Sequence, residues 1–105
     1  MFKLPKDDER YSWTYHVTQK MRQYGISESR IKRIIRYPKR TEEGIAENTV
    51  AVMQPAGTTR YQEIWVMYAV KGKKLRIITT WRYPGKSPER NPIPENVINE
   101  VRNLL

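Results

Sequence analysis

Residues 61–83 of this chain read YQEIWVMYAVKGKKLRIITTWRY. Two runs rich in Ile, Val, Trp, Tyr and Thr, the residue types that favour β-strands, flank a short KGKK segment at residues 71–74. The stretch therefore predicts one long β-hairpin. A tight turn with Gly72 at its first central position sets a register in which Ile64 faces Trp81. A turn with one extra residue would exchange the faces of one strand relative to the other.

The tight turn predicts a hairpin with two unlike faces, because successive side chains of a strand point to opposite sides. One face is almost wholly apolar and comprises Ile64, Val66, Tyr68, Val70, Leu75, Ile77, Thr79 and Trp81. The reverse face carries Glu63 opposite Arg82, together with Trp65 and Arg76. We expect helices to cover the apolar face and functional groups to gather on the reverse face.

The composition predicts a single domain with a polyanionic partner. A chain of 105 residues suffices for one core. Its 20 Lys and Arg stand against 11 Asp and Glu, which gives a net charge of +9. Such an excess favours nucleic acid, or an acidic protein, as the partner, and solubility alone is the competing explanation.

Several classes of site and location are not expected. The absence of cysteine and the single histidine argue against thiolate or histidine-rich metal sites, so we expect neither a metal nor a cofactor. No apolar run approaches the ~20 residues of a membrane span. The first ten residues lack the apolar core of a secretion signal. We therefore expect a cytoplasmic protein that does not enter a membrane.

The remaining segments predict three helices and two further strands around the hairpin. A loose lead-in (residues 1–10) and a short extended piece (11–13) precede two helices. The first is expected to be capped by Thr14 and to end at Gly25, and the second to be capped by Ser27 and to end before Pro38. Two short strands (41–46 and 49–54), a proline-rich basic arm (84–94) and a final amphipathic helix complete the chain. That helix has an apolar side comprising Val97, Ile98, Val101, Leu104 and Leu105, and is expected to begin at Asn91 or just after it.

This order of elements predicts an α+β fold, in which two N-terminal helices pack on a four-stranded antiparallel sheet. The C-terminal helix is expected at a sheet edge or partly across the second face. No composition shift divides the chain, so residues 1–105 form one domain.

The residues also resemble a known family. The run WTYHVTQKMRQYGISESRIKRIIRYPKRTEEGIAENT (residues 13–49) is similar to the start of a widespread family of small bacterial proteins of unknown function, distantly related to the BrnT-like and RelE-like toxins. The later IWVMY and IITTWRYPG segments resemble the closing strands of that family, so the resemblance spans residues 11–90. The matching motif positions are His16, Met21, Arg22, Gly25-Ile26-Ser27, Pro38 and Glu43-Gly44.

The resemblance implies a RelE-like fold and a toxin-type, metal-independent ribonuclease that acts on RNA, including messenger RNA on the ribosome. It also implies a small acidic antitoxin protein as a partner. Members without known toxicity exist in the family, and the varied active sites of the toxins match no complete set of residues in this chain.

Metal-free RNA cleavage needs a base for the 2′-hydroxyl, cations for the phosphate and a proton for the leaving oxygen. The arginines at positions 76 and 82 share a predicted face, and their planar groups suit a phosphate. The candidate catalytic residues are His16, Glu63, Arg76, Arg82 and Tyr83. Either His16 or Glu63 can serve as the base, and Tyr83 as a proton donor. The competing roles are a local hydrogen bond for His16 and an ion pair between Glu63 and Arg82.

The second helix and its exit carry six basic residues and one acidic residue between Ser27 and Thr41. This pattern is compatible both with an anionic partner and with a solvated helix face. The candidate nucleic-acid-binding residues are Lys20, Arg30, Arg33, Arg36, Lys39, Arg40, Trp65 and Lys86. Trp65 could stack on a base, or lie buried beneath the last helix.

Two hypotheses follow from the sequence. The first is a small toxin-type ribonuclease. The second is a non-catalytic module that binds nucleic acid or an acidic partner through its second helix.

Overall fold

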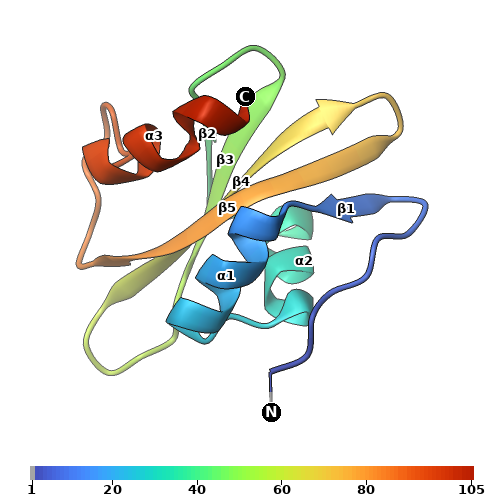
Figure 1. Cartoon of the computed structure of the whole chain (residues 1–105). Helices are drawn as coiled ribbons and strands as arrows, with labels where there is room; N and C mark the ends of the chain where they lie inside the picture. Colours follow the sequence, from blue (N-terminus) through green and yellow to red (C-terminus); the bar gives the residue numbers. More distant parts are fainter. Residues whose placement is uncertain (1) are drawn as a thin grey trace.

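The computed structural model describes residues 2–105 and has an α+β fold (Figure 1). Its elements are, in chain order, β1 (Tyr11–Trp13), α1 (Tyr15–Tyr24), α2 (Glu28–Arg36), β2 (Arg40–Glu43), β3 (Thr49–Pro55), β4 (Gln62–Lys71), β5 (Lys74–Pro84), α3 (Glu95–Val101) and a 3-10 turn, η1 (Arg102–Leu104). The prediction of an α+β fold with two N-terminal helices and a C-terminal helix is confirmed.

The sheet has five strands in the order β1-β5-β4-β3-β2 and is mixed. Strands β2 to β5 are antiparallel, as predicted, whereas β1 runs parallel to β5 with Tyr11 opposite Leu75 and Trp13 opposite Ile77. The expectation of four strands is therefore wrong by one. The short strand at residues 11–13 pairs with residues more than sixty positions later in the chain. Sequence rules that use only neighbouring residues cannot predict such a pairing.

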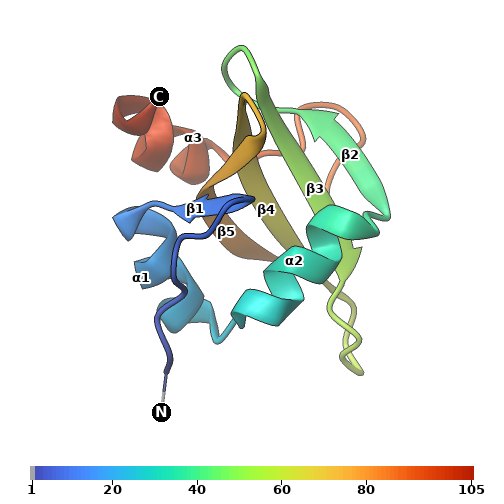
Figure 2. The ribbon, with the colours of Figure 1, turned by 90° about the vertical axis from the view of Figure 1, so that its right-hand side faces the viewer.

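Both faces of the sheet are covered. Helices α1 and α2 lie on one face, and α3 lies on the other (Figure 2). The first core contains Tyr11, Val17, Met21, Ile26, Ile31, Ile34, Val52, Ile64, Val66 and Ile77. The second core contains Ala51, Met53, Trp65, Met67, Ala69, Ile78, Trp81, Val97 and Val101. The second face is thus a core of its own rather than the open surface that the sequence predicts.

The ends of the first two helices follow the predicted capping residues. The Thr14 hydroxyl accepts a hydrogen bond from the amide of Val17 at 3.0 Å, and Ser27 accepts one from the amide of Arg30 at 3.1 Å. Gly25 ends α1 with a φ of 66°, a left-handed conformation that glycine adopts without strain. These caps confirm the predicted boundaries.

The prediction for the start of the last helix is wrong. The N-cap of α3 is Pro94 rather than Asn91, and no side chain caps the helix. Prolines at 92 and 94 hold this part of the arm extended, so helical geometry begins only after the second of them.

The hairpin turn forms as predicted, but the register holds over only part of the strands. Gly72 has a φ of 61°, and Val70 pairs with Leu75 and Tyr68 with Ile77. A β-bulge then intervenes, because Met67 pairs with Thr79 and leaves one extra residue, Ile78, in β5. Beyond the bulge every pair is displaced by one residue.

The displaced register exchanges the faces of the second half of β5. Trp81 pairs with Trp65 on the α3 side, and the two indoles stack with ring centroids 5.8 Å apart and planes 2° from parallel. Arg82 pairs with Ile64 and Tyr83 with Glu63. The predicted pairs in this half are wrong. Because helices cover both faces, an apolar residue is buried on either side, and alternation alone does not fix the register.

Among residues 2–105, no helix is both long enough and apolar enough to cross a membrane.

A double-mutant cycle tests the bulged register. We expect Trp65→Leu and Trp81→Leu to be non-additive, with a coupling of ~0.5–1.5 kcal/mol in the free energy of unfolding, because stacked aromatic pairs interact by this amount. Urea denaturation of the four proteins measures it. The control cycle pairs Trp65→Leu with Trp13→Leu, whose indoles belong to different cores, and should be additive. Additivity in the first cycle would contradict the register.

Candidate nucleic-acid interface

Helix α2 divides into a buried apolar side and an exposed basic side. Ile31 and Ile34 are fully buried against the sheet. Arg33 and Arg36, on the other side, are exposed. The helix ends at Tyr37, because the following Pro38 disfavours helical geometry there.

The outer side of α2 forms a shallow basic pocket with an aromatic wall. The pocket has a volume of about 520 Å³ and is lined by Ser29, Lys32, Arg33, Arg36 and Tyr37. The Tyr37 side chain is 65% exposed. Lys39, the next basic residue along the chain, is also exposed. We call Lys32, Arg33, Arg36, Tyr37 and Lys39 the α2 basic surface.

The charges of the α2 basic surface are mostly uncompensated. Lys32 pairs with Glu28 at 2.8 Å and lies 4.0 Å from Asp8. Within residues 2–105, the other cations of this surface form no ion pair. Neighbouring cations without counter-charges repel one another, so an anion bound here would lower their energy.

Arg82 lies on the helix side of the sheet, not on the face predicted from the sequence. The bulge turns Arg82 to the helix side, where its Nε donates to the carbonyl of Tyr24, at the end of α1, at 3.0 Å. Arg30 on α2 donates to the carbonyls of Pro55 and Ala56 at 3.2 and 3.0 Å.

The charges of Arg33 and Arg82 act on the guanidinium of Arg30. Partial burial lowers the pKa of Arg30, and the nearby charges of Arg33 and Arg82 lower it further. Within the described chain, none of the three has a carboxylate partner within ion-pair distance. The predicted pairing of Arg82 with Glu63 is therefore wrong, and Arg82 instead places its charge near Arg30 on the helix side of the sheet.

The predicted phosphate clamp of Arg76 and Arg82 is excluded by the register. Arg76 pairs with Ala69 on the α3 side of the sheet, where its Nη1 lies 3.4 Å from the carbonyl oxygen of Leu104. Arg82 is on the opposite side. Two arginines on opposite faces of a sheet cannot hold one phosphate.

Glu63 lies inside the second core as a fully hydrogen-bonded carboxylate. It is completely buried and accepts hydrogen bonds from the Tyr61 hydroxyl (3.0 Å), the Trp65 indole nitrogen (3.0 Å) and the hydroxyl and amide of Ser87 (2.6 and 3.3 Å). Burial acts to raise the pKa of Glu63, but the hydrogen bonds from Ser87, Trp65 and Tyr61 outweigh it and hold the pKa below its ordinary value. Because the carboxylate is completely buried, it is out of reach of a substrate in this structure.

Arg40 and Trp65, both predicted to bind nucleic acid, belong to the same buried network. The guanidinium of Arg40 lies 5.1 Å from the Trp65 ring centre, and it donates to the Ser87 hydroxyl at 2.8 Å and to Glu42 at 2.9 Å. Trp65 is fully buried, and the alternative that it lies beneath the last helix describes its position. This network ties the proline-rich arm to the sheet through Ser87.

Tyr83 and Lys86 lie beyond this network. Tyr83 is half-buried and packs against the second core, opposite Glu63. Lys86 is exposed in the arm, beside the buried Ser87. Lys86 is therefore exposed to solvent, as predicted, but the arm is anchored to the sheet at the next residue, Ser87.

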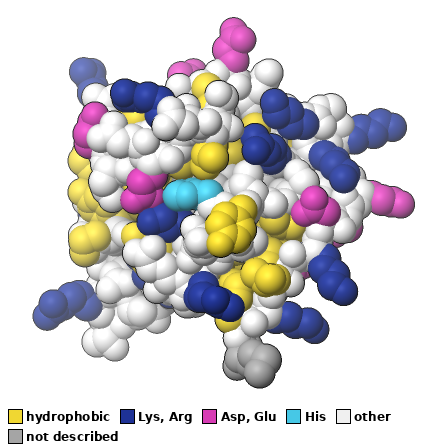
Figure 3. All heavy atoms as spheres, viewed as in Figure 1, with side chains coloured by type: hydrophobic (Ala, Val, Ile, Leu, Met, Phe, Trp, Pro, Cys, Tyr) yellow, Lys and Arg dark blue, Asp and Glu magenta, His cyan; other side chains and the backbone are white. Residues whose placement is uncertain are grey.

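His16 lies where α1 meets α3. Its Nε2 is 3.7 Å from a carboxylate oxygen of Glu100, and that same oxygen accepts the Lys20 ammonium at 3.0 Å. Figure 3 shows the imidazole at the surface beside an acidic and a basic side chain. Burial lowers the pKa of His16, Glu100 raises it and Lys20 lowers it, with a net decrease. The shift favours the neutral imidazole, and its Nε2 is buried without a hydrogen-bond partner within residues 2–105.

The five residues predicted to be catalytic thus occupy separate places. Glu63 and Tyr83 are neighbours on the second face, Arg76 lies toward the hairpin end of the same face, Arg82 is on the first face, and His16 is between α1 and α3. Of the predicted cations of α2 and its exit, Arg33, Arg36 and Lys39 are exposed in the α2 basic surface, whereas Arg30 and Arg40 are held by other contacts. Sequence reasoning missed Tyr37, although an aromatic residue between a basic helix and a proline is a signal that it could have used.

No group of three or more His, Asp or Glu side chains within residues 2–105 is placed to hold a metal ion. Comparison of the chain with known family models, curated proteins and solved structures finds no match.

The Glu63 network predicts an acid-sensitive contribution to stability. Because the pKa of folded Glu63 lies below its ordinary value of 4.5, this contribution is complete above that pH and is lost as the pH falls through the folded pKa. Glu63→Gln should lower the free energy of unfolding by ~1–3 kcal/mol near neutral pH, and by progressively less in acid. Urea denaturation at several pH values measures this difference.

Glu89→Gln, at an exposed position of the same arm, is the matched control and should stay within ~0.5 kcal/mol of the unmodified protein at every pH. A Glu63→Gln deficit that did not shrink in acid would show that its cause is packing rather than the charge.

Proposed function

We propose that this protein binds single-stranded nucleic acid through the α2 basic surface, and that its ligand is RNA. The observation that supports this most directly is the pairing of exposed, uncompensated cations with a 65% exposed aromatic ring in one pocket. This is the non-catalytic hypothesis of the sequence analysis, which already assigned binding to the second helix.

The proposal uses two kinds of contact. Arg33 and Arg36 would neutralise backbone phosphates, since guanidinium groups bind phosphate oxygens in a bidentate manner. Tyr37 would stack on a base, a contact worth ~1–3 kcal/mol in comparable sites. Stacking requires an unpaired base, which is why a single strand fits this surface better than a duplex.

The choice of RNA, and of a RelE-like fold, rests on the family resemblance. Two adjacent helices on one face of an antiparallel β2–β5 sheet are compatible with it. A small acidic antitoxin-like partner would use the same cations, so it would compete with RNA for the α2 basic surface.

Binding can be measured by fluorescence anisotropy with a labelled single-stranded RNA over a range of salt concentrations. We expect Arg33→Ala combined with Arg36→Ala to weaken binding and to reduce the salt slope by ~0.7 for each phosphate that is no longer neutralised. Tyr37→Ala should weaken binding roughly tenfold or more while leaving the salt slope nearly unchanged.

The matched control is Lys73→Ala combined with Lys74→Ala, which removes the same charge from the exposed hairpin turn. If the control weakens binding as much as the α2 double variant, the effect is one of net charge, and the proposed surface is wrong.

A toxin-type ribonuclease is the second candidate function, favoured by the environment of His16. A neutral imidazole with an unpartnered nitrogen can exchange a proton, and the neighbouring Lys20 can balance a phosphate charge. Glu100 contacts both groups and would orient them. Since Nε2 is buried, α3 would have to shift for a substrate to reach it.

The ribonuclease candidate predicts that the purified protein cleaves RNA in the presence of a metal chelator. His16→Ala should abolish cleavage, and the same variant should relieve any growth arrest on expression. His16→Ala should retain RNA binding, whereas the α2 double variant should lose it. If RNA stays intact after long incubation at high protein concentration while RNA binding is preserved, the ribonuclease candidate is wrong and only the binding function remains.

A further inference from the structure

Arg30 and Arg82 lie near each other on the helix side of the sheet, Arg30 in the first turn of α2 and Arg82 near the end of β5. Each is held in place by backbone carbonyls. The Nη2 of Arg30 donates to the carbonyls of Pro55 and Ala56, and the Nε of Arg82 donates to that of Tyr24. Both guanidinium groups are therefore positioned before a ligand arrives, which lowers the entropy cost of binding one.

Most N–H groups of this pair have no acceptor. Within residues 2–105, the Nη1 and Nε of Arg30 and both Nη nitrogens of Arg82 make no hydrogen bond. Of these nitrogens only the Nε of Arg30 is buried, so the Nη nitrogens are open to an incoming group. Guanidinium groups donate but do not accept hydrogen bonds, so a ligand that fits here must supply oxygens as acceptors.

The charge of the pair is also uncompensated. Within the part of the chain that the structure describes, no carboxylate lies within ion-pair distance of either arginine, and Glu28 of α2 is held by Lys32 at 2.8 Å. The pKa of Arg30 is lowered by its partial burial and by the charges of Arg33 and Arg82. An anion bound between the two guanidinium groups would offset this repulsion.

The shape and charge of the pair favour phosphate among the common anions. Guanidinium groups bind phosphate through parallel N–H···O hydrogen bonds, and a phosphate has enough oxygens to engage both groups at once. A phosphomonoester carries about −1.5 to −2 charges at neutral pH, which matches two arginines. A carboxylate or a backbone phosphodiester carries a single charge and would leave one arginine uncompensated.

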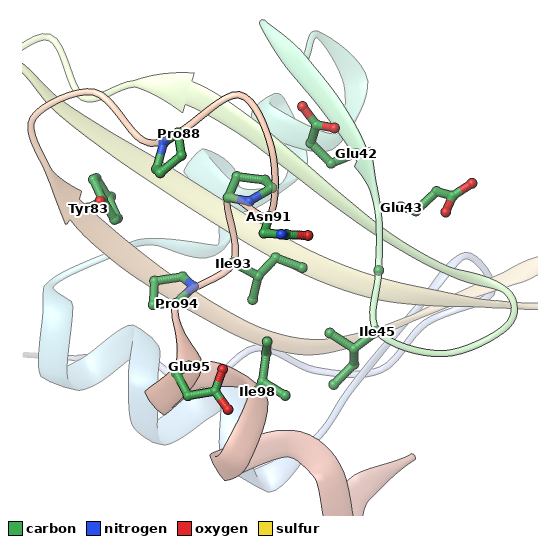
Figure 4. A pocket seen from close by; sticks show the side chains of 12 residues that line it. Glu42, Glu43, Ile45, Tyr83, Pro88, Asn91, Ile93, Pro94, Glu95 and Ile98 are labelled. Carbon is green, nitrogen blue, oxygen red and sulfur yellow. The ribbon is translucent and has the colours of Figure 1, made fainter.

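A larger pocket on the other side of the sheet does not fit the same ligand. It has a volume of about 760 Å³ and lies between β2, the proline-rich arm and α3 (Figure 4). Ile45, Ile93 and Ile98 line it together with Glu95, and among the described residues no Lys or Arg contributes to its wall. A phosphate there would meet a carboxylate and no cation, which is unfavourable.

We propose that Arg30 and Arg82 form a binding site for a dianionic phosphate group, either inorganic phosphate or a phosphomonoester. The free Nη nitrogens of both residues would hold its oxygens. The site shares no residue with the α2 basic surface, so this proposal does not depend on the proposed function.

An NMR titration of the ¹⁵N-labelled protein measures weak binding of this kind. At roughly 0.15 M ionic strength, inorganic phosphate and adenosine 5′-monophosphate should bind with dissociation constants below ~1 mM, and adenosine should not bind. Arg82→Lys keeps the charge but loses the planar fork, so it should weaken binding of both ligands roughly fivefold or more. Arg30→Lys should have the same effect, and it gives a second reading if Arg82→Lys destabilises the end of α1.

Arg76→Lys is the matched control, because Arg76 is another half-buried arginine of β5 near a backbone carbonyl, on the opposite face of the sheet. This variant and Arg36→Lys, on the α2 basic surface, should bind inorganic phosphate within about twofold of the unmodified protein. The urea midpoint of each variant shows that it is folded under the conditions of the titration.

The two ligands distinguish the source of the phosphate. A monoester that binds at least tenfold more tightly than inorganic phosphate supports a phosphomonoester as the ligand, and equal affinities support inorganic phosphate. Three results would overturn the proposal: no binding of either ligand up to ~10 mM, unchanged binding by both Arg30→Lys and Arg82→Lys, or an equal loss in Arg36→Lys or Arg76→Lys. Unchanged binding would leave Arg30 and Arg82 with structural roles only.

Discussion

One extra residue in β5 determines how this molecule uses its central hairpin. Up to the bulge at Ile78, β4 and β5 follow the register set by the Gly72 turn; beyond it, the faces are exchanged. The exchange places Trp81 on Trp65 in the second core and moves Arg82 to the helix side. With Trp81 on the second face, α3 has a large apolar surface to pack against, which completes a sheet covered on both sides.

The second consequence of this arrangement is a separation of charge. Arg82 lies near Arg30 of α2 on one side of the sheet, and the exposed Glu95 lies beside an apolar pocket on the other. Between them, the buried Glu63 and the half-buried Arg40 are satisfied by hydrogen bonds and hold the arm in place through Ser87. Buried charges are tolerated only when compensated in this way, so they serve the fold, whereas the uncompensated charges at the surface remain available to partners.

Features that depend on residues close together in the sequence could be predicted from it, whereas features that depend on contacts between distant segments could not. Caps at Thr14 and Ser27 and the turn at Gly72 depend on neighbouring residues, and all were predicted. The pairing of β1, the bulge at Ile78 and the network of Glu63 with Ser87 depend on segments far apart in the chain, and all were missed. The candidate site divides in the same way. The basic face of α2 follows from helical periodicity, but the positions of Arg82, Arg40 and Trp65 follow from the register and from the fold of the arm.

The parallel pairing of β1 has a consequence for synthesis on the ribosome. The hydroxyl of Thr14 donates to the carbonyl of Ile78, and Tyr11 pairs with Leu75. The first strand and the start of α1 are thus anchored to β5, the last strand in chain order. During translation these early segments must wait until β5 has left the exit tunnel before they can dock. The nascent chain therefore carries its first strand and helix without their β5 contacts through most of its elongation, and the sheet can be completed only late in synthesis.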